Sequence, residues 1–188
     1  ILYIPLAWKN EDFAGCLSWF TDTMSQHKPV KIEMLTDLGR NVDLKQVDAV
    51  YIGGGNTYKL LKKIKDAKFD RRLVDYYVSG GTIYGGSAGA IIFGRDINTS
   101  SICSDSDKNE VGLRDTHGID ILNGLDIQCH YRTSQLKSHK EYSAKTGRRI
   151  IAIPEESAIL VEDEKLKVVG TKPVFLINSI GIKKYNVG

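Results

Sequence analysis

The sequence predicts an α/β protein with a mainly parallel sheet covered by helices on both faces. Two observations indicate this class: short apolar strands alternate with amphipathic helices through the first half of the chain, and glycine-rich turns follow two of these strands. Such alternation favours parallel strands joined by helical crossovers. With 188 residues, the chain has the length of one domain, which we expect to span 1–188.

Hydrophobic periodicity places the elements of the first half. Strands are expected at 1–6, 30–35, 47–52 and from Thr82 onward, and helices at 13–24, 60–64 and 73–78. We expect Asn10 to cap the first helix. Because the chain starts inside a strand-like run and lacks an initial Met, we also expect a strand and a helix to precede it.

The second half combines one more strand and helix with a hairpin-like tail. A polar stretch without periodicity, 94–118, comes first, and a loop of this length is usually functional or mobile. A strand at 125–131 and a helix at 137–149 follow. The tail is expected to contain short strands at 149–153, 158–161, 166–169 and 174–177.

The stretch around Ser87 has the pattern of a nucleophile elbow. An apolar strand leads into Gly85, Ser87 follows, and Gly89 completes G-x-S-x-G. A serine attacks well when a sharp turn exposes it, and such a turn requires small neighbours. A helix that begins after Ser87 directs backbone N–H groups toward a developing oxyanion. The alternative is a tight turn whose glycines serve packing alone.

A second glycine turn, Gly53-Gly54-Gly55-Asn56, lies between a predicted strand and a predicted helix. Glycines here let the backbone approach a ligand and leave N–H groups for it. The spacing matches neither nucleotide-binding fingerprint, so an oxyanion loop, a phosphate loop and a plain turn all stay open. Because both glycine turns follow parallel strands, we expect them to meet in one crevice.

A serine nucleophile needs a base, and His130 is the preferred candidate. It ends the apolar strand 125–131, at the strand end that faces the crevice. The other histidines are expected at the surface: His27 after a helix, His117 in the polar loop and His139 on a wet helix face. A structural role for His130 is the alternative.

Four carboxylates are candidates for orienting the base. Glu155 and Glu156 follow a predicted strand, whereas Asp96 and Asp105 lie in the polar stretch after Ser87. The order Ser, His, Glu differs from the Ser, Asp/Glu, His order of α/β-hydrolases, which disfavours a lipase or esterase.

Composition excludes several classes of protein. The net charge of +3 is too small to indicate a nucleic-acid partner, and no apolar run reaches the about 20 residues of a membrane helix. Three cysteines without C-x-x-C spacing, Cys16, Cys103 and Cys129, favour a reducing cytoplasm over a disulfide framework. Asp105 and Asp107 resemble only part of a calcium loop, so no metal is expected.

Two blocks together, Gly53 to Thr57 and Gly85 to Ala90, resemble peptidase family S51, the serine peptidases that include peptidase E (aspartyl dipeptidase) and cyanophycinase. The resemblance implies a three-layer α/β/α sandwich, flavodoxin-like or class I glutamine-amidotransferase-like, with one more strand and helix in front. It also implies Ser87 as nucleophile and His130 as base, although Cys129 replaces the family's usual proline.

The resemblance further implies an oxyanion hole from the N–H of Ala88 and that of Gly54 or Gly55. For the third triad member it implies two positions. The aspartyl dipeptidases have an Asp where this chain has Ile102, beside Ser101.

Cyanophycinase-like members have a Glu in the position that Glu155 matches, with Glu156 one step away. We therefore favour Ser87, His130 and Glu155 as the triad. The arginine-bearing helix of the dipeptidases is not clearly reproduced between His130 and Gly147, so the resemblance leaves open whether amino-terminal aspartate or another residue is preferred.

The sequence thus predicts a cytoplasmic serine peptidase that hydrolyses dipeptides or short or unusual peptides without metal or cofactor. Its expected partner is a small peptide; a homodimer stays open. One alternative is a non-catalytic peptide-binding or regulatory module on the same scaffold. A second is an amidohydrolase related to the glutamine amidotransferases, which Ser87 disfavours because those enzymes carry Cys at the elbow.

Overall fold

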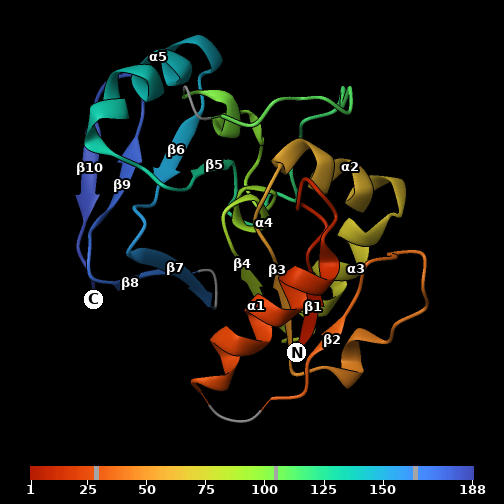
Figure 1. The fold of residues 1–188 in the computed structure, drawn as a ribbon. Coiled ribbons are helices and arrows are strands. Elements are labelled where there is room, and N and C mark those ends of the chain that lie inside the picture. Colours follow the sequence, from red (N-terminus) through yellow and green to blue (C-terminus); the bar gives the residue numbers. More distant parts are fainter. Residues whose placement is uncertain (28–29, 104–105, 163–164) are drawn as a thin grey trace. The chain divides into compact units, whose positions relative to one another are not determined.

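The computed structural model describes residues 1–27, 30–103, 106–162 and 165–188 (Figure 1). The chain divides into two compact units. The first comprises Ile1–Ala90 and Asn109–Arg114, and the second Ile91–Lys108 and Asp115–Gly188. A single domain over 1–188 stays a prediction. Within the described ranges, no helix has the length and apolar character needed to cross a membrane.

The first unit is built on a four-stranded parallel sheet in the order β2-β1-β3-β4. Its strands are β1 (Leu2–Ile4), β2 (Glu33–Met34), β3 (Ala49–Ile52) and β4 (Thr82–Gly85). The predicted α/β class with a mainly parallel sheet is therefore confirmed. The strand order changes direction between β1 and β3, and ligands of such sheets bind beyond the carboxyl ends of the strands at this point.

Helices cover both faces of this sheet, with α1 on one face and α2 and α3 on the other (Figure 1). Their bounds are α1 (Phe13–Ser25), α2 (Thr57–Asp66) and α3 (Phe69–Val78), and a 3₁₀ turn η1 (Leu44–Gln46) precedes β3. The connection from β1 to β2 through α1 runs in one direction across the sheet, and the connection from β3 to β4 through α2 and α3 runs in the other. Because crossovers between parallel strands are right-handed, the two connections place their helices on opposite faces. On the α1 face, the rings of Tyr3 and Phe20 stack with centroids 4.3 Å apart.

Two local expectations for this unit are wrong. Asp12, not Asn10, caps α1, because its side chain accepts a hydrogen bond from the Gly15 N–H at 2.9 Å. The strand expected at 30–35 is reduced to the two residues of β2, whose only partner among the described strands is β1. At a sheet edge, alternation alone does not determine how far pairing extends.

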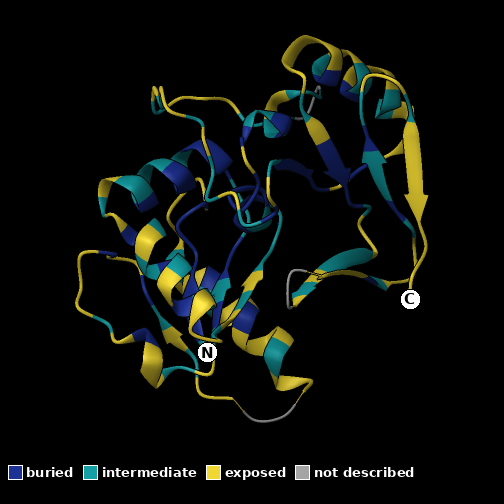
Figure 2. Ribbon diagram, turned by 180° about the vertical axis from the view of Figure 1, so that it is seen from behind, coloured by how far each residue is buried: buried dark blue, intermediate teal, exposed yellow. Residues whose placement is uncertain are grey.

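The second unit contains a mixed four-stranded sheet in the order β10-β9-β6-β5. β5 (Leu125–Gln128) and β6 (Arg149–Ala152) are parallel, whereas β9 (Val174–Ile177) and β10 (Ile182–Tyr185) are antiparallel to their neighbours. β7 (Ser157–Glu162) and β8 (Lys165–Gly170) form a separate hairpin. Every residue of β5 is buried and every residue of β10 is exposed (Figure 2). β10 has no counterpart among the strands expected from the sequence.

The remaining elements are short, except for α5 (Leu136–Thr146), which follows the 3₁₀ turn η3 (Thr133–Gln135) and contacts β6 and β9. The polar stretch 94–118 contains the 3₁₀ turn η2 (Asn98–Ser101) and an isolated bridge between Asp96 and His117. Part of this expected loop is therefore ordered by local pairing.

Candidate active site

Ser87 lies in a strand–turn–helix elbow, as the sequence predicts. It follows β4 and precedes α4 (Ala88–Ile91), with φ at 51°, in the left-handed region that non-glycine residues rarely adopt. The flanking positions leave no space for side chains. A Cβ on Gly85 would lie 2.3 Å from the Gly89 carbonyl oxygen, and one on Gly89 would lie 2.2 Å from the Ile52 oxygen.

The glycine turn that follows β3 packs against this elbow. A Cβ on Gly54 would lie 3.1 Å from the Cβ of Ser87. Gly55 has φ at 136°, and a Cβ there would lie 2.2 Å from the Ala7 carbonyl oxygen. The Asn56 N–H donates to the same oxygen at 2.8 Å. In the first unit, the turns that follow β1, β3 and β4 therefore meet at the carboxyl edge of the sheet.

The side chain of Asn56 has a structural task at this edge. It is buried, and its Oδ1 accepts a hydrogen bond from the Lys59 N–H at 2.9 Å, which caps α2. Its role in binding an oxyanion or a substrate stays a prediction.

His130 and Glu155 are brought together in the second unit. A hydrogen bond joins His130 Nδ1 to Glu155 Oε2, and the two side chains are 55% and 71% exposed. Gln128 and Ala152 end the parallel strands β5 and β6 and lie opposite each other. His130 and Glu155 therefore both lie just beyond the carboxyl ends of neighbouring strands. His130 has φ at 55°, in the left-handed region.

Backbone hydrogen bonds extend this strand pairing past the ends of β5 and β6. The Ile153 N–H donates to the Gln128 oxygen at 2.8 Å, and the Tyr131 N–H donates to the Ile153 oxygen at 3.0 Å. The residues on both sides of His130 are thus tied to the segment that leads to Glu155.

The rival carboxylates have other surroundings. Glu156 is exposed, and its backbone oxygen accepts a hydrogen bond from the Thr171 N–H. Asp105 lies outside the described residues. Asp96 is buried; its Oδ2 accepts from the Thr116 hydroxyl at 2.9 Å and lies 3.4 Å from Arg148 Nη2. Asp96 therefore belongs to an internal network.

This network centres on Asp126, which is fully buried within β5. Its carboxylate accepts hydrogen bonds from the Tyr142 hydroxyl at 2.9 Å and the Asp96 N–H at 3.1 Å, and lies 3.4 Å from Arg148 Nη1. Burial raises the pKa of Asp126, an effect that Tyr142 and Arg148 oppose. The network connects β5, α5 and the residues that follow α4.

Sequence reasoning missed the surroundings of His139, and its placement on a wet helix face is wrong. The side chain is fully buried, with Nε2 3.0 Å from Gln128 Oε1. A signal for this was present: Asp126 and Gln128 alternate as polar residues within an apolar strand, and His139 and Tyr142 are three apart on α5. His27 and His117 are exposed, as expected.

Cys129, the neighbour of His130, lies in an apolar environment. Cys129 is buried, and burial, with a smaller contribution from the charge of Glu155, raises the pKa of its thiol to about 12, so the thiol stays protonated at neutral pH. In the part of the chain that the structure describes, no three His, Cys, Asp or Glu residues gather in a way that could hold a metal ion.

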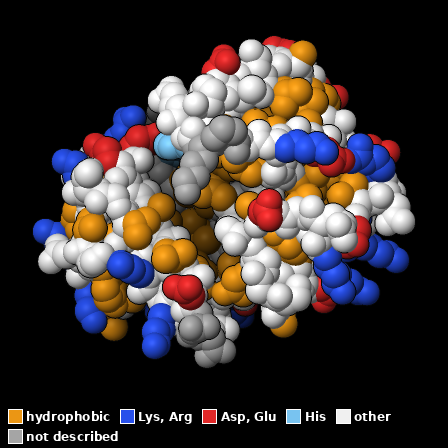
Figure 3. Space-filling model, turned by 90° about the horizontal axis from the view of Figure 1, so that it is seen from below, with side chains coloured by type: hydrophobic (Ala, Val, Ile, Leu, Met, Phe, Trp, Pro, Cys, Tyr) orange, Lys and Arg blue, Asp and Glu red, His pale blue; other side chains and the backbone are white. Residues whose placement is uncertain are grey.

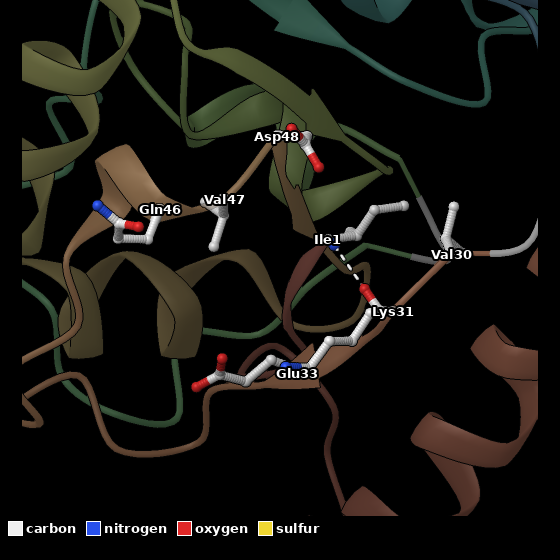
Figure 4. A pocket seen from close by; sticks show the side chains of 7 residues that line it. All are labelled: Ile1, Val30, Lys31, Glu33, Gln46, Val47 and Asp48. Atoms are coloured by element: carbon white, nitrogen blue, oxygen red, sulfur yellow. Dashed lines mark hydrogen bonds between the residues drawn. The ribbon is translucent and has the colours of Figure 1, made fainter.

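The first unit contains a pocket, whose lining side chains Figure 4 shows. Its volume is about 290 Å³, and its lining residues are Ile1, Val30, Lys31, Glu33, Gln46, Val47 and Asp48. Since Ile1 and Asp48 directly precede strands, the pocket lies at the amino end of the sheet, opposite Ser87. On the face shown in Figure 3, the Lys and Arg side chains among the described residues are interspersed with acidic ones.

The first unit has a parallel sheet with a serine elbow at its carboxyl edge. These features define the class of the protein, an α/β protein with a hydrolase-type elbow. The family model described as Peptidase family S51 matches residues 1–169. The chain belongs to this family, which confirms the resemblance seen in the sequence.

Named relatives agree with this membership. Peptidase E of Salmonella newport (strain SL254) is 26% identical over 162 residues, which cover 79% of this chain. The chain spans 66% of the length of this curated relative. Peptidase E of Salmonella typhimurium (strain LT2) is 25% identical over the same length.

Solved structures show the same fold. A peptidase from an acI-B1 Actinobacterium superimposes with a TM-score of 0.74 at 19% identity, covering 100% of this chain and 81% of that one. A Listeria monocytogenes EGD-e protein assigned to peptidase E gives 0.72 at 21% identity, covering 91% and 86%.

Proposed function

We propose that the protein is a serine peptidase that hydrolyses dipeptides or other short or unusual peptides through Ser87, His130 and Glu155. The observation that carries the proposal is the hydrogen bond between His130 Nδ1 and Glu155 Oε2. Membership of peptidase family S51 and the left-handed serine elbow support it. Ser87 and the His130–Glu155 pair belong to different compact units, so their meeting is part of the proposal.

In the proposed reaction, Ser87 Oγ attacks the scissile carbonyl carbon while His130 Nε2 takes its proton. Glu155 holds Nδ1–H and so leaves Nε2 to act as the base. The tetrahedral oxyanion accepts hydrogen bonds from the N–H of Ala88 and from that of Gly54 or Gly55. Loss of one such donor typically costs about 10²–10³ in kcat.

Collapse of this intermediate breaks the C–N bond, and His130 returns the proton to the leaving amine. Water then attacks the acyl-enzyme with His130 again as base, which releases the acid and restores Ser87. Each proton removed by His130 is given back, so the chemistry needs no metal or organic cofactor. The proposed partner is a small peptide.

A fluorophosphonate probe followed by peptide mass mapping tests the nucleophile on the full protein. We expect a label on Ser87 of the wild type, much slower labelling of His130→Ala, and none at this position in Ser87→Ala. Turnover of a dipeptide and isoaspartyl-peptide library should disappear in Ser87→Ala. Wild-type turnover by folded Ser87→Ala would overturn the proposal.

Labelling combined with two further assays, peptide binding and ammonia release, separates the alternatives. A folded wild type that binds peptides but takes up no label would indicate a binding module. Release of ammonia from carboxamide substrates, without peptide cleavage, would indicate an amidohydrolase.

A further inference from the structure

His139 is a buried histidine that the proposed mechanism does not use. Its side chain is fully buried on α5, and burial lowers its pKa, so the neutral ring predominates at neutral pH. Nδ1 lies 2.8 Å from the backbone oxygen of Gln135, and Nε2 lies 3.0 Å from Gln128 Oε1. A neutral imidazole has one N–H, so it can donate to only one of these oxygens.

Gln128 is the side chain that links His139 to the turn at His130. Its side chain is buried at the end of β5, and its Nε2 donates to the Cys129 carbonyl oxygen at 2.6 Å. With the amide nitrogen engaged there, Oε1 is the side-chain atom of Gln128 that lies next to His139 Nε2. The chain of contacts from His139 through Gln128 therefore ends on the peptide group that joins Cys129 to His130.

His139 also contacts the residue that follows His130. Its ring meets the Tyr131 ring edge to face, with centroids 5.5 Å apart and an interplanar angle of 87°. Tyr131 is itself buried, and its backbone N–H is bound to Ile153. One buried side chain thus supports the backbone both before and after His130.

This support acts on an unfavourable backbone conformation. His130 has φ at 55°, where a side chain with a Cβ is strained, and such a conformation persists only when the surrounding structure holds it. The neighbours of His130 on both sides are buried, and the Tyr131 N–H donates to the Ile153 oxygen, so contacts at Cys129 and Tyr131 help to hold the turn.

We propose that His139 is a positioning residue for His130: through Gln128 and Tyr131 it holds the turn in which the base meets Glu155. The inference rests on the proposed function, because it assigns His139 a task in orienting that base. His139 itself touches neither substrate nor nucleophile.

The test compares His139→Leu with His139→Gln, because a glutamine amide can still donate to Gln128 whereas leucine only fills space. With a dipeptide substrate that the wild type hydrolyses, we expect His139→Leu to lower kcat by roughly 10- to 100-fold, as misplaced catalytic groups do. KM should change little, and His139→Gln should retain most of kcat. His27→Leu, a change at an exposed histidine, is the matched control and should behave as the wild type.

A second readout does not depend on turnover. In ¹⁵N-labelled protein, the ring signals of His130 should report a bound Nδ1–H in the wild type and in His139→Gln, and lose it in His139→Leu. Should His139→Leu fail to fold, Gln128→Leu removes the same link from its other end.

The outcomes distinguish the two proposals. Suppose that Ser87→Ala loses activity, while His139→Leu keeps the wild-type kcat and the wild-type His130 signals. This result would overturn the positioning role alone. Wild-type activity in Ser87→Ala would overturn the proposed function. Equal losses of kcat in His139→Leu and His139→Gln would mean that the hydrogen-bonding link to Gln128 is not what His139 contributes, and would also overturn the positioning role.

Discussion

His130 and Glu155 are joined by a hydrogen bond between Nδ1 and Oε2, although 25 residues separate them in the sequence. The parallel pairing of β5 with β6 produces this meeting, since each residue follows the carboxyl end of its strand. Glu156 is the next residue and has no such contact among the described hydrogen bonds. The pairing therefore distinguishes two adjacent carboxylates whose position after a predicted strand does not separate them.

Replacement of Glu155 by Gln should lower kcat by roughly 10²–10⁴-fold, because an amide no longer stabilises the imidazolium or fixes its tautomer. Glu156→Gln is the matched control and should retain wild-type kcat. Steady-state kinetics on a short peptide measure both variants. A larger loss in Glu156→Gln than in Glu155→Gln would refute the assignment of Glu155.

Replacement of Gly89 by Ala should destabilise the elbow, because the new Cβ would lie 2.2 Å from the Ile52 carbonyl oxygen. Forced backbone shifts of this kind cost about 1–3 kcal/mol. Gly181→Ala adds a Cβ in open space and is the control. Urea unfolding measures both, and equal midpoints for the two variants would show that the close contact is absent.

Removal of Arg148 should destabilise the second unit, because Asp126 and Asp96 would keep their buried carboxylates without a cation. We expect Arg148→Leu to cost about 3 kcal/mol, at the low end of the range for buried pairs because Arg148 is partly exposed. Lys62→Ala breaks an exposed pair with Asp66 and should cost about 0.5 kcal/mol or less. Urea unfolding measures both variants. Equal losses of unfolding free energy in Arg148→Leu and Lys62→Ala would contradict a stabilising role of the Asp126 network.

His139 should make stability depend on pH. Its folded pKa is lowered by burial, whereas the unfolded chain takes up the proton near pH 6.5. Below that pH the unfolded state binds more protons, so this contribution to stability is complete above about pH 6.5 and is lost as the pH falls through the folded pKa.

Urea midpoints at pH 8 and pH 5.5 test this expectation. The drop between them should be larger in the wild type than in His139→Gln, and His27→Gln should keep the wild-type drop. A His139→Gln variant with the full wild-type drop would show that another group is responsible.

Local patterns determined much of this protein. The alternation of strands and helices predicted the parallel sheet, and the small residues around Ser87 predicted the elbow, because steric limits on a tight turn act between sequence neighbours. Strand ends identified His130 and Glu155 as candidates. The resemblance carried by the two glycine blocks, together with the family match, then gave the family.

Tertiary contacts decided the rest. The burial of His139, its link to Gln128, and the network around Asp126 depend on how α5 packs against β5 and β6, which periodicity along one element does not specify. The same holds for Asp96, a candidate for the triad by sequence and an internal residue by structure. A polar side chain that looks solvated in sequence is buried when a distant segment supplies its hydrogen bonds, and only the folded chain brings that segment to it.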